Sequence, residues 1–282
     1  MNEFCIKAPA KINLYLDVLG KRPDGYHDLK MIMQTVSIYD EIKLKKIHSG
    51  IELSTNAKIP TGEKNTAYKA AKLMISKFGL QAGVNIEIKK NIPTGAGLAG
   101  GSADAAAVIK GMDQLFNLGQ KDEYLAQIGK NVGADVPFCV IGGTAIAEGI
   151  GEKITQLTSF NDIDIVLVKP DFSVSTAYVF GKYVGDQSIV KPCIQELISS
   201  MKNHDTQTAG KNLYNALETV TVVDYPIIAE IKSELVKLGA DGSLMSGSGS
   251  TVFGIFKNTE KAKIAFNHMN LKYKATFLVK TI

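Results

Sequence analysis

Apolar and polar residues alternate with a period of two in several parts of the first half of the chain, which predicts β-strands. Residues 12–18 alternate in this way and run into a polar turn, KRPDGYHD. Residues 34–38 and 41–44 form two shorter patterns of the same kind. Residues 84–89 carry a polar side chain at every second position, so this strand is expected to have one face in water.

A longer period of three to four residues predicts helices among these strands. Residues 66–78 have this pattern, and a shorter helix is expected over residues 123–131. The clearest helix begins near Ser102, because its apolar side chains fall on one face. These side chains are Ala105, Val108, Ile109, Met112, Leu115 and Phe116.

The second half of the chain alternates strands and helices without a repeat. Residues 163–168 form a continuous apolar run, typical of a buried strand, which Pro170 ends. Further helices are expected over residues 193–201, 212–220 and 226–239 and after Thr259, and further strands over 251–256 and 275–279. With a boundary near Phe160, the pattern predicts an α+β protein of two domains, residues 1–160 and 161–282, with a cleft between them.

Composition narrows the function classes. The 282 residues carry a formal net charge of +4 spread along the chain, and the densest basic group, Lys43, Lys45 and Lys46, alternates with apolar residues as a strand face does. Nucleic-acid binding is therefore not expected, whereas an anionic small substrate is compatible with the charge. The three cysteines are far apart, and no apolar run reaches the length of a membrane span or of a signal sequence. We expect a cytoplasmic protein without a membrane partner.

Glycines gather in the stretch PTGAGLAGGSADAA, between the strand at 84–89 and the helix near Ser102. Three interpretations compete. One is a tight turn without a ligand, for which four glycines within seven residues are more than is needed. The second is dinucleotide binding, because G-x-G-x-x-G is present, but the half-polar strand before it argues against a doubly wound sheet.

The third interpretation is a cradle for a nucleotide triphosphate outside the P-loop class. Glycine lets backbone N–H groups converge on an anion, and the following helix adds the free N–H groups of its first turn. The P-loop pattern G-x-x-x-x-G-K-[ST] does not occur in the sequence, so a lysine elsewhere and a metal ion would supply positive charge.

Three more polar sites stand out from their surroundings. Lys11 and Asn13 alternate onto one face of an otherwise apolar strand, where a surface lysine is the ordinary alternative. Asp135 lies in GADVPF among apolar neighbours, either as a turn residue or as a carboxylate able to take a proton from a hydroxyl. The segment LMSGSGSTVF supplies Gly247, Ser248 and Gly249 before a strand, either as a flexible turn or as part of a site.

Together these segments resemble the GHMP kinases, which carry an N-terminal motif, a glycine-rich phosphate loop and a C-terminal glycine motif in this order. The segments APAKINLYLDV, RPDGYHDL, GLAGGSADAA and GADVPFCVIGGTAIAEG are most similar to the branch that acts on a cytidine diphosphate-linked sugar alcohol in the non-mevalonate isoprenoid pathway. The D-G-Y-H turn is the most discriminating piece. The resemblance runs from about Ala8 to the last strand and implies a two-domain GHMP fold with the active site in the interdomain cleft.

The resemblance also implies an ATP- and Mg²⁺-dependent phosphorylation of the 2-hydroxyl of this substrate. Asp135 would take the hydroxyl proton, with Lys11 beside it as the second catalytic residue. Asn65 and Lys90 match positions that contact the nucleoside of ATP. The loop that would wrap the phosphates consists of Pro93, Thr94, Gly95, Ala96, Gly97, Leu98, Ala99, Gly100, Gly101, Ser102 and Ala103.

The same resemblance assigns the substrate end. Tyr26 and His27 match a cytosine-binding pair, and Phe180 matches an aromatic that stacks on the base, with Tyr178 as the alternative. Asn13 and Thr176 would position the substrate, and Gly247, Ser248 and Gly249 would line the cleft opposite. The Mg²⁺ ligands are not assigned by the sequence, and a monomer or weak homodimer is expected. The alternatives are another GHMP kinase of the homoserine or mevalonate type, an NAD-dependent oxidoreductase, and a ligand-binding protein without turnover.

Overall fold

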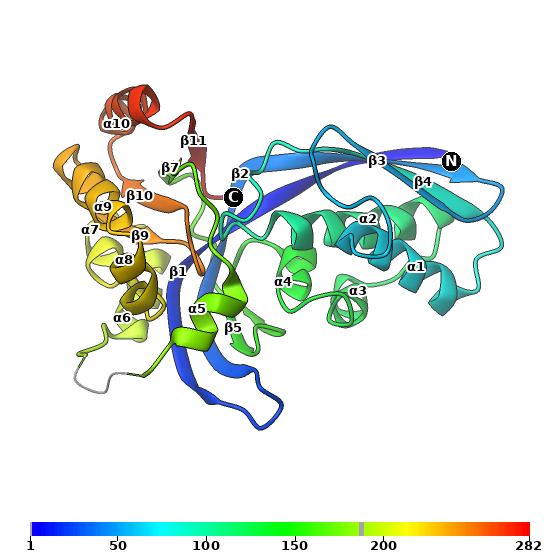
Figure 1. The fold of residues 1–282 in the computed structure, drawn as a ribbon, viewed down its shortest axis with the longest axis horizontal. Helices are drawn as coiled ribbons and strands as arrows, with labels where there is room; N and C mark the ends of the chain where they lie inside the picture. Colours follow the sequence, from blue (N-terminus) through cyan, green and yellow to red (C-terminus); the bar gives the residue numbers. More distant parts are fainter. Residues whose placement is uncertain (1, 186–188) are drawn as a thin grey trace. The chain divides into compact units, whose positions relative to one another are not determined.

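The computed structural model describes residues 2–185 and 189–282, which form two compact units, each assembled from several chain segments. The long strands β1 (Glu3–Lys21) and β2 (His27–Ile47) contribute residues to both units (Figure 1). The first unit holds the described residues up to Ala10, Ile38–Ile92 and Ala99–Gly142, and the second holds Lys11–Ser37, Pro93–Leu98 and Gly143–Ile282. The division near residue 160 remains a prediction, because grouping by contact does not follow the order of the chain.

The first unit is a sheet covered by helices. Its further elements are β3 (Ile51–Thr55), α1 (Thr66–Phe78), β4 (Gly83–Lys89), α2 (Gly100–Phe116), α3 (Asp122–Gly129) and α4 (Val136–Ile141). The strands follow the order β3, β4, β2, β1, and the four helices lie on one side of them (Figure 1). Along β4 the side chains of Val84, Ile86 and Ile88 are buried, whereas Glu87 and Lys89 are exposed, which confirms the predicted strand with one wet face.

Strand β4 precedes the glycine loop, and its neighbours decide between two of the interpretations. It pairs antiparallel with β2, with Leu44 opposite Ile86, and parallel with β3, with Leu53 opposite Ile86. A doubly wound dinucleotide-binding sheet needs parallel neighbours on both sides of its central strands. The prediction of a sheet that is not doubly wound is therefore confirmed at this strand.

Helices α1 and α2 position the site of the first unit. Helix α1 has the predicted bounds, because Asn65 caps its N-terminus and Gly79 ends it in the left-handed conformation at φ 58°. Helix α2 begins at Gly100, two residues before the predicted start, and it packs against α1, α3 and α4. Its apolar face is buried, as its period predicted: Val108, Ile109, Met112 and Leu115 have no exposed surface.

The second unit contains two sheets. Its further elements are β5 (Thr144–Gly149), β6 (Lys153–Gln156), β7 (Asp164–Lys169), α5 (Thr176–Lys182), α6 (Ile194–Lys202), α7 (Thr206–Lys211), β8 (Tyr214–Asn215), α8 (Glu218–Asp224), α9 (Ile227–Lys237), β9 (Gly242–Met245), β10 (Val252–Phe256), α10 (Thr259–Lys272) and β11 (Ala275–Lys280). Strands β5 and β8 extend the sheet of β1 and β2, and β6 pairs with β5. The other sheet has the order β11, β7, β10, β9.

The sheet of β7 forms the core of this unit. Strand β7 pairs antiparallel with both β10 and β11, and its residues from Ile165 to Val168 have no exposed surface. Helices α9 and α10 pack on β10, and α10 also packs on β7 and β11. The buried strand predicted from the continuous apolar run is therefore confirmed, as are the strands predicted at β10 and β11.

The helix predicted over residues 212–220 is wrong. Residues 214 and 215 form β8 instead, in a parallel pairing of Tyr214 with Tyr15 and of Asn215 with Leu16. The side chain of Asn215 donates hydrogen bonds of 2.8 Å to the carbonyl oxygens of Met245 and Gly247. Tertiary pairing with a neighbouring strand thus overrides the helical period, and helix α8 begins only at Glu218.

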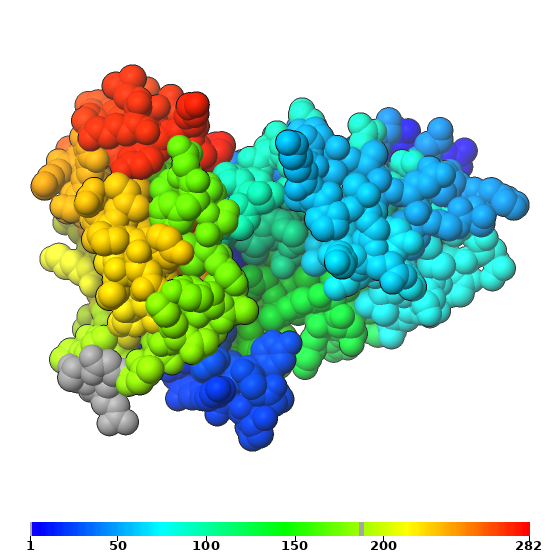
Figure 2. Space-filling model, viewed as in Figure 1, coloured from blue at the N-terminus to red at the C-terminus, as the bar shows by residue number. Residues whose placement is uncertain are grey.

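Other differences follow from context that a local pattern does not contain. The strands expected at 34–38 and 41–44 are parts of the single long strand β2, and helices α4, α5 and α7 were not predicted. Helix α10 lies at the surface (red in Figure 2), where Leu271 is exposed. None of the helices among the described residues combines the length and the apolar character that crossing a membrane requires.

Candidate active site

The N-terminus of α2, where the sequence predicts a phosphate site, has no side-chain cap. Its cap is Ala99, which adopts the left-handed conformation at φ 55° and has no side-chain oxygen to accept the N–H groups of the first turn. Thr66, the first residue of α1, donates its hydroxyl hydrogen to the Gly101 carbonyl at 2.6 Å and so fixes this turn. The first-turn amides carry the positive end of the helix dipole and suit a phosphate group.

The side chain of Asn65, predicted to contact the nucleoside, has a structural role as well. Its Oδ1 accepts the N–H of Ala67 at 2.8 Å, and its Nδ2 donates to the Pro60 carbonyl at 2.8 Å. The residue is 7% exposed. Asn65 therefore fixes the start of α1, and its contact with the nucleoside stays a prediction.

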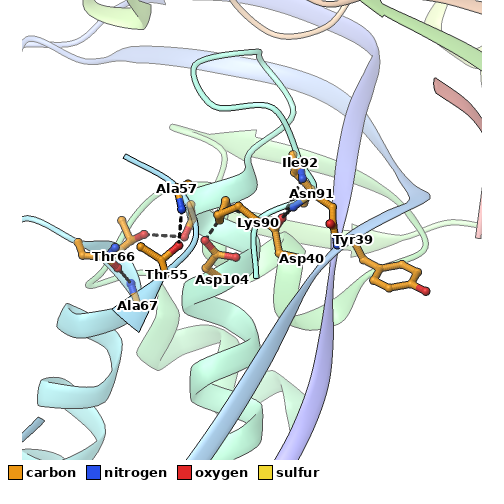
Figure 3. A network of polar contacts seen from close by, with 12 residues as sticks. Tyr39, Asp40, Thr55, Ala57, Thr66, Ala67, Lys90, Asn91, Ile92 and Asp104 are labelled. Atoms are coloured by element: carbon orange, nitrogen blue, oxygen red, sulfur yellow. Dashed lines mark hydrogen bonds and ion pairs between the residues drawn. The ribbon is translucent and has the colours of Figure 1, made fainter. Parts of the chain in front are cut away.

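Lys90 lies in a buried cluster of charges that the sequence did not reveal (Figure 3). Its ammonium group forms ion pairs with Asp40, from β2, and with Asp104, from the first turns of α2, the second at 2.7 Å. The three side chains are 6%, 0% and 3% exposed. Burial, opposed by the charge of Lys90, raises the pKa of the Asp104 carboxyl to about 7, and the negative charge of Asp40 adds to the rise.

In the second unit, the loop segment Pro93–Leu98 lies against the face of β1 that carries Lys11 and Asn13. Lys11 is 4% exposed, and its Nζ donates to Asn13 Oδ1 at 2.7 Å and to the Gly97 carbonyl at 3.3 Å. The backbone N–H of Lys11 donates to the Leu98 carbonyl at 3.2 Å. The lysine that the alternation singled out is thus buried beside the glycine loop rather than on the surface.

Close packing of the protein explains why two residues of this segment are glycine. Gly95 and Gly97 are both left-handed, at φ 60° and 76°. A Cβ added at Gly97 would lie 2.1 Å from the Ser246 carbonyl oxygen, and one at Gly95 would lie 2.9 Å from the side chain of Ser173. Close approach of other protein segments, and not only of a ligand, therefore requires glycine at these two positions.

The C-terminal glycine motif meets the same loop. Ser246 Oγ donates to the Gly97 carbonyl at 2.9 Å, and a Cβ at Gly247 would lie 3.2 Å from that oxygen. The hydroxyls of Ser248 and Thr176 are 2.9 Å apart. The structure therefore brings together these predicted site residues of the second unit: Lys11, Asn13, Gly97, Thr176, Gly247 and Ser248.

The aromatic residues predicted for cytosine are also neighbours within the second unit. The rings of His27 and Phe180 stack with centroids 5.2 Å apart at an angle of 30°. Tyr26, the adjacent residue, is 61% exposed. Tyr178 points elsewhere, because its hydroxyl donates to Asp224 at 3.0 Å, which favours Phe180 as the stacking residue. At this separation no third ring fits between His27 and Phe180, so a base would stack on an outer face or after the rings separate.

Asp135, the predicted base, belongs to the first unit. It is half-buried at the N-cap of α4, whose second residue is Pro137, and the neighbouring side chains of Val136 and Phe138 are buried. A poorly hydrated surrounding for the Asp135 carboxylate stays a prediction. Its predicted closeness to Lys11 stays a prediction, as does the role of each residue in catalysis.

The remaining residues of the glycine loop differ in whether their side chains are accessible to a ligand. Ala96, Leu98 and Ala103 are at most 3% exposed, so a ligand at the loop would meet their backbone and not their side chains. Pro93, Thr94, Ala99, Gly100, Gly101 and Ser102 retain exposed surface. Among the described residues, no three His, Cys, Asp or Glu side chains gather closely enough to hold a metal ion by themselves.

Two family models match separate stretches of the chain. The model of the GHMP kinases N terminal domain matches residues 65–143, and that of the GHMP kinases C terminal domain matches residues 197–275. The chain is 50% identical over 278 residues to 4-diphosphocytidyl-2-C-methyl-D-erythritol kinase of Clostridium beijerinckii, which covers 98% of this chain and 99% of the relative. It is 48% identical over 283 residues, the full length of both chains, to the enzyme of that name from Acetivibrio thermocellus.

Two solved structures superpose on this chain over nearly its whole length. A crystal structure of 4-(cytidine 5'-diphospho)-2C-methyl-D-erythritol kinase superposes with a TM-score of 0.86 at 30% identity, covering 99% of both chains. A homoserine kinase from Cytophaga hutchinsonii superposes with a TM-score of 0.80 at 18% identity, covering 100% of this chain and 95% of the other. At 18% identity, the similarity to the homoserine kinase shows a shared fold only.

Proposed function

Because this chain belongs to the GHMP kinase family, as the resemblance predicted, we propose that it transfers the γ-phosphoryl group of ATP to the 2-hydroxyl of 4-diphosphocytidyl-2-C-methyl-D-erythritol. The observation that carries the proposal is 50% identity, over 98% of the chain, to a relative with that name. The stack of His27 on Phe180 supports it, because this pair offers an aromatic surface and a ring nitrogen to a base. The product would enter the non-mevalonate route to isoprenoid precursors.

Phosphoryl transfer depends on position and on charge stabilisation more than on covalent help from the protein. The amides of Gly100, Gly101 and Ser102 open α2 and would bind phosphate oxygens. The side chain of Lys11, held by Asn13 and the Gly97 carbonyl, would stabilise charge on the transferring group. Asp135 would accept the proton of the attacking hydroxyl.

A magnesium ion, when bound with ATP, would neutralise charge on the phosphates. Mg²⁺ keeps several waters and takes substrate phosphates with one or two carboxylates, so it does not need a cage of protein ligands. Among the described residues, no three His, Cys, Asp or Glu side chains form such a cage.

Placement in the cell and assembly are part of the proposal. We infer a cytoplasmic enzyme, monomeric or weakly dimeric, that acts on a small molecule and not on nucleic acid. The net charge of +4 over 282 residues, without a dense basic run, is consistent with a small anionic substrate.

An acceptor panel tests the proposed function. Labelled ATP is incubated with the protein and with 4-diphosphocytidyl-2-C-methyl-D-erythritol, homoserine or mevalonate, and the phosphorylated products are separated. We expect the first acceptor to be phosphorylated with a kcat/KM at least a hundredfold above the others, because a site that stacks and hydrogen-bonds a base rejects acceptors lacking one. Preferred phosphorylation of homoserine or mevalonate, or ATP binding without transfer to any acceptor, would overturn the assignment.

A further inference from the structure

A second layer of residues lies behind the candidate phosphate site in the first unit. Lys90 follows the last residue of β4, and its ammonium group pairs with Asp40 and with Asp104 Oδ2 (Figure 3). A Cβ added at Gly100 would lie 3.3 Å from Lys90 Nζ. The lysine is therefore packed against the first residue of α2, where the open amides begin.

Asp40 also holds the backbone that leads into the glycine loop. Its Oδ1 accepts the N–H of Asn91 at 2.6 Å and the N–H of Ile92 at 2.8 Å, while its Oδ2 pairs with Lys90. One carboxylate thus fixes three consecutive residues just before Pro93. Asp40 has no exposed surface, so these bonds are shielded from competing water.

Charge in the cluster does not balance. Two carboxylates face one ammonium group, and Asp104 Oδ1 is buried without a hydrogen-bond partner among the described residues. The charged groups that act on Asp104 are Lys90, from the end of β4, and Asp40, from β2. Helix α1 presents the neutral hydroxyl of Thr66 to the same turn. When Asp104 is ionised, the cluster carries a net negative charge behind the site for an anion.

We propose that Asp40 and Asp104 are positioning residues for ATP: Asp40 fixes Lys90 and the entry of the glycine loop, and the protonation state of Asp104 sets how strongly the first turn of α2 attracts the phosphates. The inference rests on the proposed function, since it takes ATP as the ligand of this turn. A buried carboxylate one turn from the open amides opposes a polyphosphate when charged and not when neutral. Burial already raises the pKa of Asp104 to about 7, so its charge changes within the range where the protein can be assayed.

Titration calorimetry of the full chain with ATP and Mg²⁺, from pH 6 to pH 8.5, tests the proposal. We expect Kd for ATP to rise with pH more steeply in the wild type than in Asp104→Asn. Over the whole range, the rise in the wild type should be about fivefold larger than the rise in the variant. Asn is neutral at every pH and resembles the protonated acid in shape, so the variant is expected to fold. Taking the difference between the two proteins removes the titration of ATP itself.

Asp113→Asn is the matched control. Asp113 is a buried carboxylate in the same helix, nine residues further on, and its Oδ1 accepts the N–H of Gln120. It lies about 13 Å along the axis from Asp104, so its variant should keep the pH dependence of the wild type. A positioning role also predicts that Asp104→Asn changes KM for ATP and leaves kcat at saturating ATP within about twofold.

Three results would overturn the inference. The first is an equal pH dependence of ATP affinity in the wild type and in Asp104→Asn. The second is that Asp113→Asn loses the pH dependence of ATP affinity as Asp104→Asn does. The third is that kcat of Asp104→Asn falls without a change in KM for ATP. The wild type alone gives a further check: calorimetry at pH 7 in two buffers of different ionisation enthalpy should show more proton uptake on ATP binding than that of ATP and Mg²⁺ alone. Absence of ATP binding in all proteins would instead contradict the proposed function.

Discussion

The carbonyl oxygen of Gly97 accepts hydrogen bonds from Ser246 Oγ, at 2.9 Å, and from Lys11 Nζ, at 3.3 Å. Lys11 is 4% exposed, so its side-chain nitrogen needs hydrogen-bond acceptors from the protein in place of water. Asn13 Oδ1, at 2.7 Å, is another of these acceptors. The side chain is thereby held in one orientation, as a group that stabilises a developing charge must be.

Asp135→Asn tests the proposed base. Asn keeps the size of the side chain but cannot take a proton, so kcat should fall by a factor of about 10²–10⁴. The affinity for ATP, measured by calorimetry, should stay within about twofold, because the carboxylate is assigned to the hydroxyl and not to the nucleotide. Turnover near that of the wild type would remove Asp135 from the mechanism.

Lys11→Ala should likewise lower kcat more than it weakens ATP binding. Loss of the ammonium group also leaves the Asn13 and Gly97 oxygens with fewer donors, so thermal unfolding must be measured beside the kinetics. A variant that melts near the wild-type temperature and still turns over normally would contradict the catalytic role of Lys11.

The aromatic residues His27 and Phe180 support a prediction about specificity. His27→Ala and Phe180→Ala should each raise KM for the cytidine diphosphate substrate roughly tenfold, the value of a base–aromatic stack, with little change in KM for ATP. Tyr178→Phe is the control, because it removes only the hydroxyl that donates to Asp224. Equal changes in both KM values, or a larger effect from Tyr178→Ala than from Phe180→Ala, would place the base elsewhere.

Local sequence patterns predicted the helices and strands whose caps, period and end residues all lie within a short stretch of the chain. Helix α1 has its cap, its period and its terminal glycine in the sequence, and it forms over the predicted residues. Strand β8 has no such signal, because its two residues pair with β1, about 200 residues away in the chain. Family resemblance assigned Lys11 and Gly97 to the site, but it did not predict their contact, and Asp40 and Asp104 were missed.

The two missed aspartates differ in how they could have been found. Asp104 lies four residues before Val108, on the apolar face of α2, and a carboxylate on a buried face needs a charged partner. Asp40 lies within β2 beside ordinary strand residues, and its partners Asn91 and Ile92 follow only after 50 further residues. Its role depends on tertiary contacts that no local pattern contains.

The glycine loop gives a prediction at the scale of an element. Gly97→Ala should destabilise the protein by about 1–3 kcal/mol more than Gly119→Ala, since its new methyl group would meet the Ser246 carbonyl oxygen. Both glycines have positive φ, at 76° and 66°, but nothing lies within 4 Å of a Cβ at Gly119. Chemical denaturation measures the difference in the free energy of unfolding. Equal decreases in the two variants would mean that the loop accommodates the methyl group without destabilising the protein.

At the scale of the whole molecule, the free energy of unfolding should depend on pH through Asp104. Burial raises its pKa from 3.8 to about 7, so between these values the folded chain holds a proton that the unfolded chain has released. Stability from this group is therefore present at low pH and is lost as pH rises toward and through 7. Asp104→Asn should gain stability over the wild type as pH increases from 4 to 8, as measured by urea denaturation. A constant difference across that range would contradict the buried charge.

Both halves of the chain match GHMP kinase models, and the described residues form two compact units to which β1 and β2 both contribute. The proposed reaction takes both a nucleotide and an acceptor, so the two ligands together test the account better than either alone.

A crystal structure of the protein with a non-hydrolysable ATP analogue, Mg²⁺ and 4-diphosphocytidyl-2-C-methyl-D-erythritol is the most direct measurement. We predict that the triphosphate lies on the N–H groups of Gly100, Gly101 and Ser102, and that the substrate 2-hydroxyl lies about 2.6–3.2 Å from the carboxylate of Asp135. A triphosphate bound away from the first turn of α2, or a 2-hydroxyl beyond the reach of Asp135, would contradict the proposed mechanism.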